Sequence, residues 1–291
     1  MRAGIIGAGR VGCSLALALS KKGLQGTGVY GRNAESVRII LEGQAVTAFE
    51  RMDELVKNCD TIFITVPDQA ISEVARLIVQ SCNSSDLTGK TFLHCSGALA
   101  SGVLSCIRET GGFTGSLHPI QTFPDKTNSW ESMYNIFFGF EGTSEAEATA
   151  EKVVSLLEGR ILRVNTEGKS LYHAAACILS NYMVALSYSA GQLLEGAGIN
   201  ADIGLKAFAP LVRSTVGNIE RLGNIDALTG PISRGDTDTV EAHLDAMEGK
   251  FPDAAMLYRS LGRATVALAL EKGTIKEERA RELIQLLGKS K

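Results

Sequence analysis

The sequence lacks the closely spaced cysteine pairs that bind zinc. Its cysteines are scattered without any Cys-x-x-Cys pair, and several lie in apolar segments that we predict to be helices or strands. We interpret them as reduced, mostly buried small hydrophobic residues. The sequence therefore predicts neither a disulfide framework nor a metal site. The six cysteines are Cys13, Cys59, Cys82, Cys95, Cys106 and Cys177.

Excess charge and long apolar runs are also missing. The formal net charge is −3 at pH 7, which gives no reason to expect nucleic acid or an anionic membrane as a partner. Only Arg2 precedes a short apolar run that soon meets glycines, so we expect neither a signal peptide nor a membrane span there. We therefore expect a cytoplasmic protein.

The sequence does contain enough apolar residues to form a core. It has 291 residues, of which 45% are hydrophobic, and a chain of this length favours two domains over one. No internal repeat and no low-complexity tract divides it. The organisation must therefore be inferred from motifs and from the periodicity of the apolar residues.

A glycine-rich turn lies close to the start of the chain, between Ala3 and Gly12. A short apolar strand precedes it, and an apolar helix is predicted over Val11 to Leu19. The glycine spacing is typical of a dinucleotide-binding turn, whose diphosphate lies at the helix N-terminus. A tight turn without a ligand is the alternative. The predicted cofactor-binding residues in this turn are Gly7, Ala8, Gly9, Arg10, Val11 and Gly12.

The second predicted strand, Thr27 to Tyr30, is followed by Gly31, Arg32 and Asn33 instead of an acidic residue. An acidic residue about 20 positions beyond the glycines would bind the ribose 2′-hydroxyl of NAD, whereas an arginine pairs with the 2′-phosphate of NADP. We therefore predict NADP as the cofactor, with Tyr30, Gly31 and Asn33 also in its site. The alternative is that Arg32 is a solvated loop charge.

Strands and helices alternate as far as Val164. Further strands are predicted over residues 45–48, 61–66, 91–94, 113–117 and 160–164, with an aromatic strand inside 129–142. This alternation predicts an α/β fold with a doubly wound parallel sheet of the Rossmann type. Ligands bind beyond the carboxyl ends of such strands. At these ends Val66, Pro67 and His94 are predicted to bind the cofactor, and Ser96 and His118 are predicted to be catalytic.

The pattern becomes helical from Gly168 onward. Lys169 to Glu195 is predicted as one long helix, because it has helical composition and no proline. Four further helices are predicted over residues 203–222, 237–246, 254–270 and 276–287. We therefore expect a cofactor-binding Rossmann domain of residues 1–166 and an all-α domain of residues 167–291 for substrate binding and dimerisation.

This plan resembles the superfamily of 6-phosphogluconate dehydrogenase, β-hydroxyacid dehydrogenases, ketopantoate reductase, pyrroline-5-carboxylate reductase and prephenate dehydrogenase. More closely, it resembles a bacterial family of predicted oxidoreductases in which a Rossmann-like domain precedes a helical domain of unknown function. The resemblance spans nearly the whole chain and implies a homodimer built on the helical half, but it names no substrate. The segments that carry it are His94–Ala98, His118–Phe123, Tyr172–Ala176, Ser180–Tyr182 and Thr229–Asp236.

Candidate catalytic residues lie at the start of the long predicted helix. In β-hydroxyacid dehydrogenases this helix carries a lysine followed one turn later by an asparagine. Here Lys169 is followed one turn later by His173, and the asparagine comes only at Asn181. At about 100° per residue, Lys169, His173 and Ser180 share one helix face within roughly 40°.

We predict that His173 acts as the acid/base, because imidazole titrates near neutrality. Lys169 and Asn181 are predicted to orient the substrate. The alternatives are that His173 caps a helix or makes an interdomain hydrogen bond, and that Lys169 is a solvated charge.

His94, Ser96 and His118 are further candidates, because their strand ends are expected to face the nicotinamide. The alternative for each is a polar loop residue that bonds to the backbone. A metal site built from His94, Cys95 and His118 is not expected, since no pair of them has zinc-like spacing. By resemblance to pyrroline-5-carboxylate reductase, Ser233 or Arg234 would reach a substrate carboxylate across a dimer interface, with a solvated turn as the alternative.

These observations predict an NADP-dependent oxidoreductase. It would transfer a hydride to or from the C=O or C=N bond of a small, carboxylate-bearing substrate. A protein that binds NADP as a sensor, and contacts a partner without turnover, is the alternative, because a fold alone does not determine function.

Overall fold

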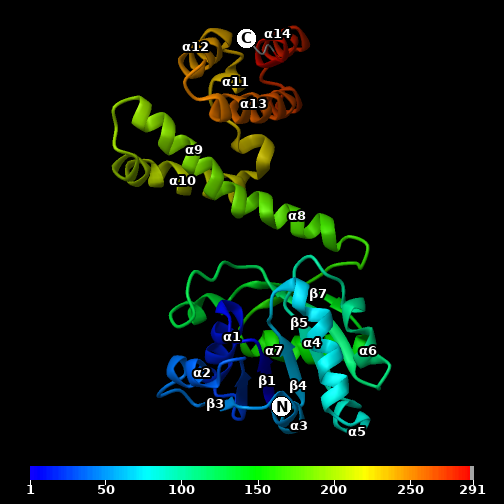
Figure 1. Cartoon of the computed structure of the whole chain (residues 1–291). Helices are drawn as coiled ribbons and strands as arrows, with labels where there is room; N and C mark the ends of the chain where they lie inside the picture. The colour runs from blue at the N-terminus through cyan, green and yellow to red at the C-terminus, as the bar shows by residue number, and fades with distance from the viewer. Residues whose placement is uncertain (289–291) are drawn as a thin grey trace. The chain divides into compact units, whose positions relative to one another are not determined.

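The computed structural model describes residues 1–288. They form two compact units, a first unit of Met1–Ser180 and a second unit that begins at Asn181. Figure 1 shows both units along the chain, and each is described by itself below.

The first unit alternates strands with helices. Its strands are β1 (Ala3–Ile6), β2 (Thr27–Tyr30), β3 (Val46–Phe49), β4 (Thr61–Ile64), β5 (Thr91–His94), β6 (Phe113–Pro119), β7 (Phe137–Gly142) and β8 (Arg160–Arg163). Its α-helices are α1 (Arg10–Lys21), α2 (Ala34–Ile40), α3 (Met52–Asn58), α4 (Asp68–Ser81), α5 (Ser84–Leu87), α6 (Ser105–Arg108), α7 (Ser144–Leu156) and α8 (Lys169–Leu179). Two 3₁₀ helices cover Ser101–Leu104 and Ser129–Met133.

The strands form one sheet in the order β3-β2-β1-β4-β5-β6-β7-β8. Its first six positions follow the classic Rossmann order, in which the strand order reverses between β1 and β4. The predicted α/β fold with a doubly wound sheet is therefore confirmed. Two strands differ from the predicted parallel arrangement, because β7 runs antiparallel to β6 and β8 runs parallel to β7. The segment between β6 and β7 contains no crossover α-helix to return the chain to the other end of the sheet.

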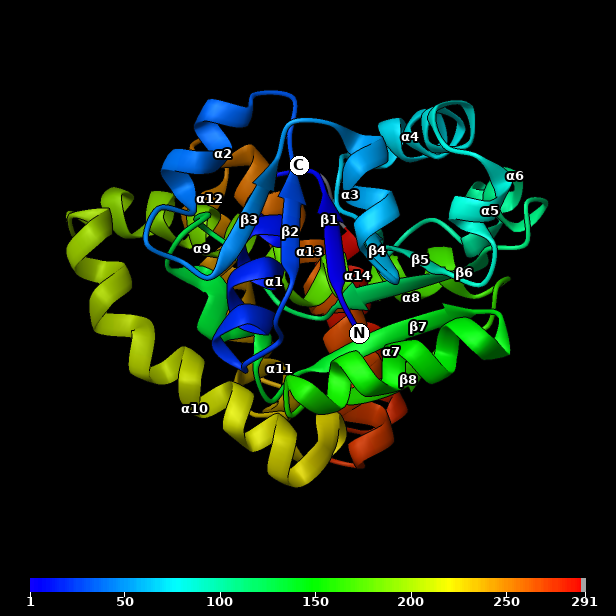
Figure 2. The same cartoon turned by 90° about the horizontal axis from the view of Figure 1, so that it is seen from below.

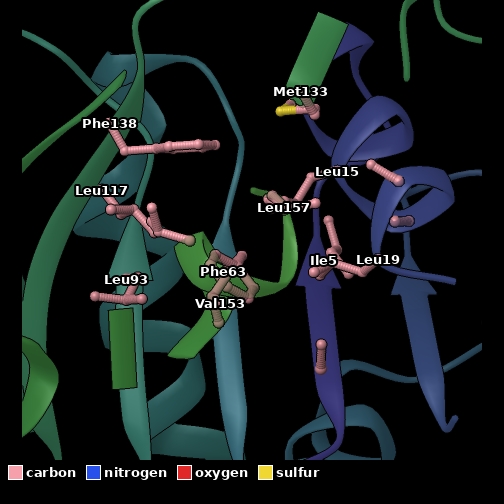
Figure 3. Close-up of a cluster of buried hydrophobic side chains, with 14 of the residues drawn as sticks. Ile5, Leu15, Leu19, Phe63, Leu93, Leu117, Met133, Phe138, Val153 and Leu157 are labelled. Atoms are coloured by element: carbon pink, nitrogen blue, oxygen red, sulfur yellow. The ribbon is translucent and has the colours of Figure 1, made fainter. Parts of the chain in front are cut away.

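Alternate residues of the central strands pack into two separate cores, one on each face of the sheet. Ile5, Phe63 and Leu93 belong to the core beneath α1 and α7, and Figure 3 shows their side chains among those of Leu117, Phe138 and Val153. Ile62 and Phe92 belong to the core beneath α3, α4 and α6. Figure 2 shows the helices of the two layers on opposite sides of the strands.

The second unit is helical. Its elements are α9 (Asn181–Gly196), α10 (Ala201–Ala227), α11 (Pro231–Arg234), α12 (Thr237–Met247), α13 (Pro252–Lys272) and α14 (Glu277–Gly288). Val240, Leu244, Val266 and Leu283 form the centre of its core. Within residues 1–288, no helix has both the length and the apolar composition that a membrane crossing requires.

The prediction of one continuous helix from Lys169 to Glu195 is wrong. α8 ends at Leu179, Ser180 takes φ −121° and ψ −71°, and α9 begins at Asn181. Serine and asparagine favour such breaks, because their short polar side chains compete for backbone hydrogen bonds. The helix predicted to hold Lys169, His173 and Ser180 on one face therefore ends before Ser180.

The break also bears on the domain boundary. The first compact unit continues through α8 to Ser180, although the change in sequence character lies near residue 166. α8 packs with the sheet because the side chain of its first residue, Lys169, is buried among strand and loop atoms of the first unit.

Candidate functional site

The turn after β1 takes a backbone conformation that favours glycine. Gly7 has a φ of +116°, and a Cβ on it would lie 2.9 Å from the carbonyl group of Thr65. A Cβ on Gly12 would overlap both the Gly7 carbonyl oxygen and Oγ1 of Thr65. A side chain at either position would therefore force the turn away from the ends of β1 and β4.

The N-terminus of α1 opens at this turn. The Gly9 carbonyl accepts the Cys13 N–H at 3.0 Å, so the N–H groups of Arg10, Val11 and Gly12 have no partner within the helix. The first turn carries no acidic side chain, and a Cβ on Gly9 would meet no atom closer than 3.8 Å. Free N–H groups and the positive end of the helix dipole suit the negative charge of a diphosphate.

The end of β2 borders the same turn. The Tyr30 carbonyl accepts the Gly7 N–H at 2.8 Å, and a Cβ on Gly31 would lie 3.1 Å from Cβ of Ala8. Arg32 is exposed and makes no hydrogen bond or ion pair with any residue in the range 1–288. Asn33 uses its side chain to accept the Ser36 N–H at 2.9 Å and so caps α2.

Val66 and Pro67 follow β4 on the other side of the turn. Cγ1 of the half-buried Val66 would lie 3.0 Å from a Cβ on Gly7, and the exposed Pro67 precedes the first residue of α4. The predicted cofactor residues at the ends of β1, β2 and β4 thus surround one helix N-terminus.

Lys169 is buried, with only 2% of its surface exposed. Its Nζ donates to Oγ of Ser116 at 2.8 Å and to the Ser96 carbonyl at 3.3 Å. Burial lowers the pKa of this ammonium group, against the raising effect of the nearby Glu141 and Asp68 carboxylates. The lysine therefore ties α8 to β6 and to the loop after β5, and it is not the solvated charge considered as an alternative.

His94 and Ser96 also have partners within the first unit. Nδ1 of His94 accepts the Ser96 N–H at 3.2 Å, and Nε2 faces the Ala100 carbonyl at 3.3 Å. Oγ of Ser96 donates to the Asp68 carboxylate at 2.8 Å and accepts the Leu99 N–H at 3.0 Å. Both side chains are buried. Their hydrogen bonds hold the loop of residues 95–100 in shape.

A buried carboxylate that sequence reasoning missed supports the same loop. Glu141 of β7 accepts the Ser101 N–H at 2.6 Å and the Ser101 hydroxyl at 2.7 Å. It also accepts the hydroxyl of Thr166, three residues before α8, at 3.2 Å. A single acidic residue in an aromatic strand gives no sequence signal for this role.

His118, Tyr172 and His173 form an aromatic cluster where β6 meets α8. Nδ1 of His118 lies 2.7 Å from the Tyr172 hydroxyl, and the rings of the two histidines are 6.1 Å apart at 79°. Gly97 packs against both imidazoles, because a Cβ there would lie 2.7 Å from Nδ1 of His173 and 3.0 Å from Cε1 of His118. The structure thus brings together His118 and His173, two of the predicted catalytic residues.

His118 and His173 differ in which ring nitrogen lacks a hydrogen-bond partner. Nδ1 of His173 is buried without a hydrogen-bond partner, and its Nε2 lies 3.6 Å from Sγ of Cys177. Nε2 of His118 has no hydrogen-bond partner among residues 1–288. Unlike Nδ1 of His173, it is not fully buried. His118 therefore presents an accessible, unused nitrogen.

Burial keeps both histidines of the strand ends neutral. Desolvation, and then the charge of Lys169, lower the pKa of His94 and of His118 to about 4. Burial raises the pKa of Tyr172 to about 12. Near pH 7 the cluster therefore holds a neutral imidazole and a protonated phenol.

The remaining predicted residues lie in the second unit. Asn181 is exposed at the start of α9, Ser233 is buried with Oγ 3.4 Å from the Thr274 hydroxyl, and Arg234 is exposed. The six cysteines are free thiols. No group of three or more histidine, cysteine or acidic side chains within residues 1–288 is arranged to hold a metal ion.

Tyr172 is the residue of this cluster that sequence reasoning left without a role. Its only signal is its place beside His173, in one of the segments that carry the family resemblance. The contact with His118 depends on Gly139 of β7, since a Cβ at that position would overlap the Tyr172 hydroxyl.

The lowered pKa of His118 predicts a loss of stability in acid. The unfolded chain binds a proton on this ring near pH 6.5, whereas the folded chain resists it until about pH 4. The unfolding free energy therefore falls as the pH drops through this window, by about 1 to 2 kcal/mol from this residue between pH 7 and pH 5. Urea titrations of wild type and His118→Gln at both pH values measure the difference. Equal pH-dependent losses in the two proteins would contradict the assignment.

Two domain families match the chain. Residues 1–119 match the Rossmann-like domain, and residues 136–265 match a domain of unknown function, DUF2520. Among curated proteins, no sequence matches the chain.

Solved structures share the fold across both units. A predicted NADP oxidoreductase from Bacteroides fragilis is 24% identical with a TM-score of 0.73, over 91% of this chain and 98% of that chain. A protein from Thermotoga maritima is 25% identical with a TM-score of 0.71, over 93% and 99%. The pyrroline carboxylate reductase of Plasmodium falciparum, solved with NADP bound, is 14% identical with a TM-score of 0.63, over 98% of both chains.

The strand order, the glycine turn and the helical second unit agree with these matches. Residues 1–119 thus match a Rossmann-like domain, and residues 136–265, which run from β7 to α13, match DUF2520.

Proposed function

We propose that the chain is an NADP-dependent oxidoreductase that transfers a hydride to or from a C=O or C=N bond. The observation that carries this proposal is the glycine turn. Its positions 7 and 12 exclude a side chain, and it opens on the free N–H groups of α1 at the point where the strand order reverses. The NADP in the similar pyrroline carboxylate reductase structure supports the same cofactor here.

The cofactor site consists of the residues around this turn. The N–H groups of Arg10, Val11 and Gly12 would bind the diphosphate, and Arg32 would bind the 2′-phosphate of NADP. Arg32 suits this role because its guanidinium is exposed and has no partner within residues 1–288. When bound, the cofactor supplies the hydride.

His118 is the proposed contact with the reacting bond. β6 is parallel to β5, β4 and β1, so His118 near its carboxyl end lies at the same edge of the sheet as the glycine turn. Its free Nε2 can donate a proton or a hydrogen bond to a substrate atom. His173 stays a candidate acid/base beside it, whereas Lys169, Ser96 and His94 support the site through the bonds described above.

The proposed substrate is small and carries a carboxylate. The family resemblance supports this proposal. The name of the similar pyrroline carboxylate reductase also supports it, because pyrroline carboxylate is a cyclic imine that carries a carboxylate. Asn181 is proposed to orient the substrate, and Ser233 or Arg234 to reach its carboxylate across a dimer interface, as the resemblance to pyrroline-5-carboxylate reductase implies. The cytoplasmic location stays a prediction.

We also propose a homodimer built on the helical unit. Large apolar side chains of α9 and α10 are exposed to solvent: they include Val184 (72%), Tyr188 (69%), Phe208 (49%) and Leu211 (60%). A groove of about 700 Å³ runs among side chains of these two helices, and Arg213 is the one charged residue in its lining. Apolar surface of this extent marks an interaction site, and homodimer interfaces have this composition.

A substrate screen tests the activity. Keto acids, imino acids and hydroxy acids are incubated with NADPH or NADP, and the nicotinamide absorbance is followed. Turnover of any compound supports an oxidoreductase, whereas no turnover of any compound together with tight NADP binding favours a sensor.

For a compound that turns over, we expect His118→Gln to lower kcat by about 100-fold or more. Unchanged kcat would remove His118 from the mechanism.

The choice of cofactor depends on Arg32. Removal of a charged hydrogen bond to phosphate costs about 1.5 to 3 kcal/mol, so Arg32→Ala should raise the Kd of NADPH by about 10-fold or more. The Kd of NADH should change little, because NADH has no 2′-phosphate. Calorimetric titration measures both constants, with Arg108→Ala on α6 as the control variant. Equal losses for the two cofactors would overturn the assignment.

The dimer depends on the apolar surface of α9 and α10. Analytical ultracentrifugation should find wild type at twice the chain mass of 30.9 kDa. The double variant Phe208→Asp, Leu211→Asp should sediment as a monomer, because each carboxylate would be buried unpaired in the interface. Ile39→Asp, at an exposed position of α2 in the first unit, is the control and should remain a dimer. A wild-type monomer would refute the proposal.

A further inference from the structure

The contact between Tyr172 and His118 fixes which nitrogen of His118 carries the proton. The hydroxyl and Nδ1 are 2.7 Å apart, and the rings meet edge to face at 88° with centroids 5.7 Å apart. A phenol O–H is a stronger acid than the N–H of a neutral imidazole, so the phenol donates and Nδ1 accepts. The proton of the neutral ring is then on Nε2, the nitrogen without a partner among residues 1–288.

The surroundings hold the phenol in place. Gly139 pairs with His118 across β6 and β7, and the Tyr172 hydroxyl occupies the space that a Cβ on Gly139 would need. Nζ of the buried Lys169 lies 5.7 Å from the centre of the Tyr172 ring, within the range of a cation–π contact.

We propose that Tyr172 and His118 form a proton relay to the atom that receives the proton during reduction. This inference rests on the proposed function, in which NADPH is the hydride donor. As the hydride bonds to the carbon of a C=O group, the π electron pair moves to oxygen. That oxygen takes the proton from Nε2 of His118, while Nδ1 takes the proton from the Tyr172 hydroxyl. The starting state is restored when Nδ1 returns its proton to the phenolate and Nε2 takes a proton from water.

The relay explains how a neutral histidine delivers a proton. The pKa of His118 is lowered to about 4 by burial and by Lys169, so a stored imidazolium is not available near pH 7. A transfer through both ring nitrogens leaves the ring neutral before and after the step. Tyr172, with a pKa raised to about 12, remains a stronger acid than a simple alcohol and can protonate an alkoxide.

The tautomer of His118 tests the relay without any substrate. Nitrogen-15 NMR of histidine-labelled protein distinguishes Nε2–H from Nδ1–H, and His118→Gln assigns the signals. We expect Nε2–H in wild type and a loss of this preference in Tyr172→Phe. Tyr258→Phe is the matched control, because it removes a second tyrosine–histidine bond, 2.9 Å long, to His243. It should leave the His118 signals unchanged. Nδ1–H in wild type, or an unchanged tautomer in Tyr172→Phe, would overturn the relay.

A kinetic test separates the relay from the proposed function. With a carbonyl compound that turns over, Tyr172→Phe should lower kcat by about 10- to 100-fold with little change in KM, and it should alter the solvent deuterium isotope effect. An unchanged kcat and isotope effect would refute the relay while leaving the oxidoreductase intact. If no compound turns over, the proposed function fails, and the NMR result still decides the tautomer.

Discussion

The candidate site depends on the buried ammonium of Lys169. It is the first residue of α8, and its two hydrogen bonds reach a strand hydroxyl and a loop carbonyl at the edge of the sheet. A buried charge is stable only if its donors are satisfied. The start of α8 is therefore held where Tyr172 and His173 meet His118, so that one lysine orients the cluster without touching its reactive nitrogen.

The glycine turn and the aromatic cluster of the first unit differ in how far the sequence alone predicts them. The glycine turn is local, because Gly7 to Gly12 specify a strand, a turn and a helix within one short stretch, and sequence reasoning placed them correctly in the fold. The cluster is non-local. His118, Gly139 and Tyr172 come from β6, β7 and α8, and their contact requires an antiparallel strand that periodicity alone did not reveal.

The break at Ser180 shows a second limit of sequence reasoning. Apolar composition on both sides of Ser180 favours helix, so a continuous helix was the natural prediction. Whether one serine interrupts it depends on tertiary packing, which outweighs propensities that differ by less than 1 kcal/mol per residue. Likewise, a histidine at a strand end can be a ligand or a support, and only the partners of its ring nitrogens distinguish His94 from His118.

The pairing of β6 with β7 makes the site sensitive to the length of the loop before β7. His118 lies opposite Gly139, whereas the residues on either side, Phe138 and Phe140, lie opposite Pro119 and Leu117. A deletion or insertion of one residue in the loop before β7 that shifted this register would put a phenylalanine where the tyrosine needs space. The length of that loop therefore determines whether Tyr172 can reach His118, although the two segments are far apart in the sequence.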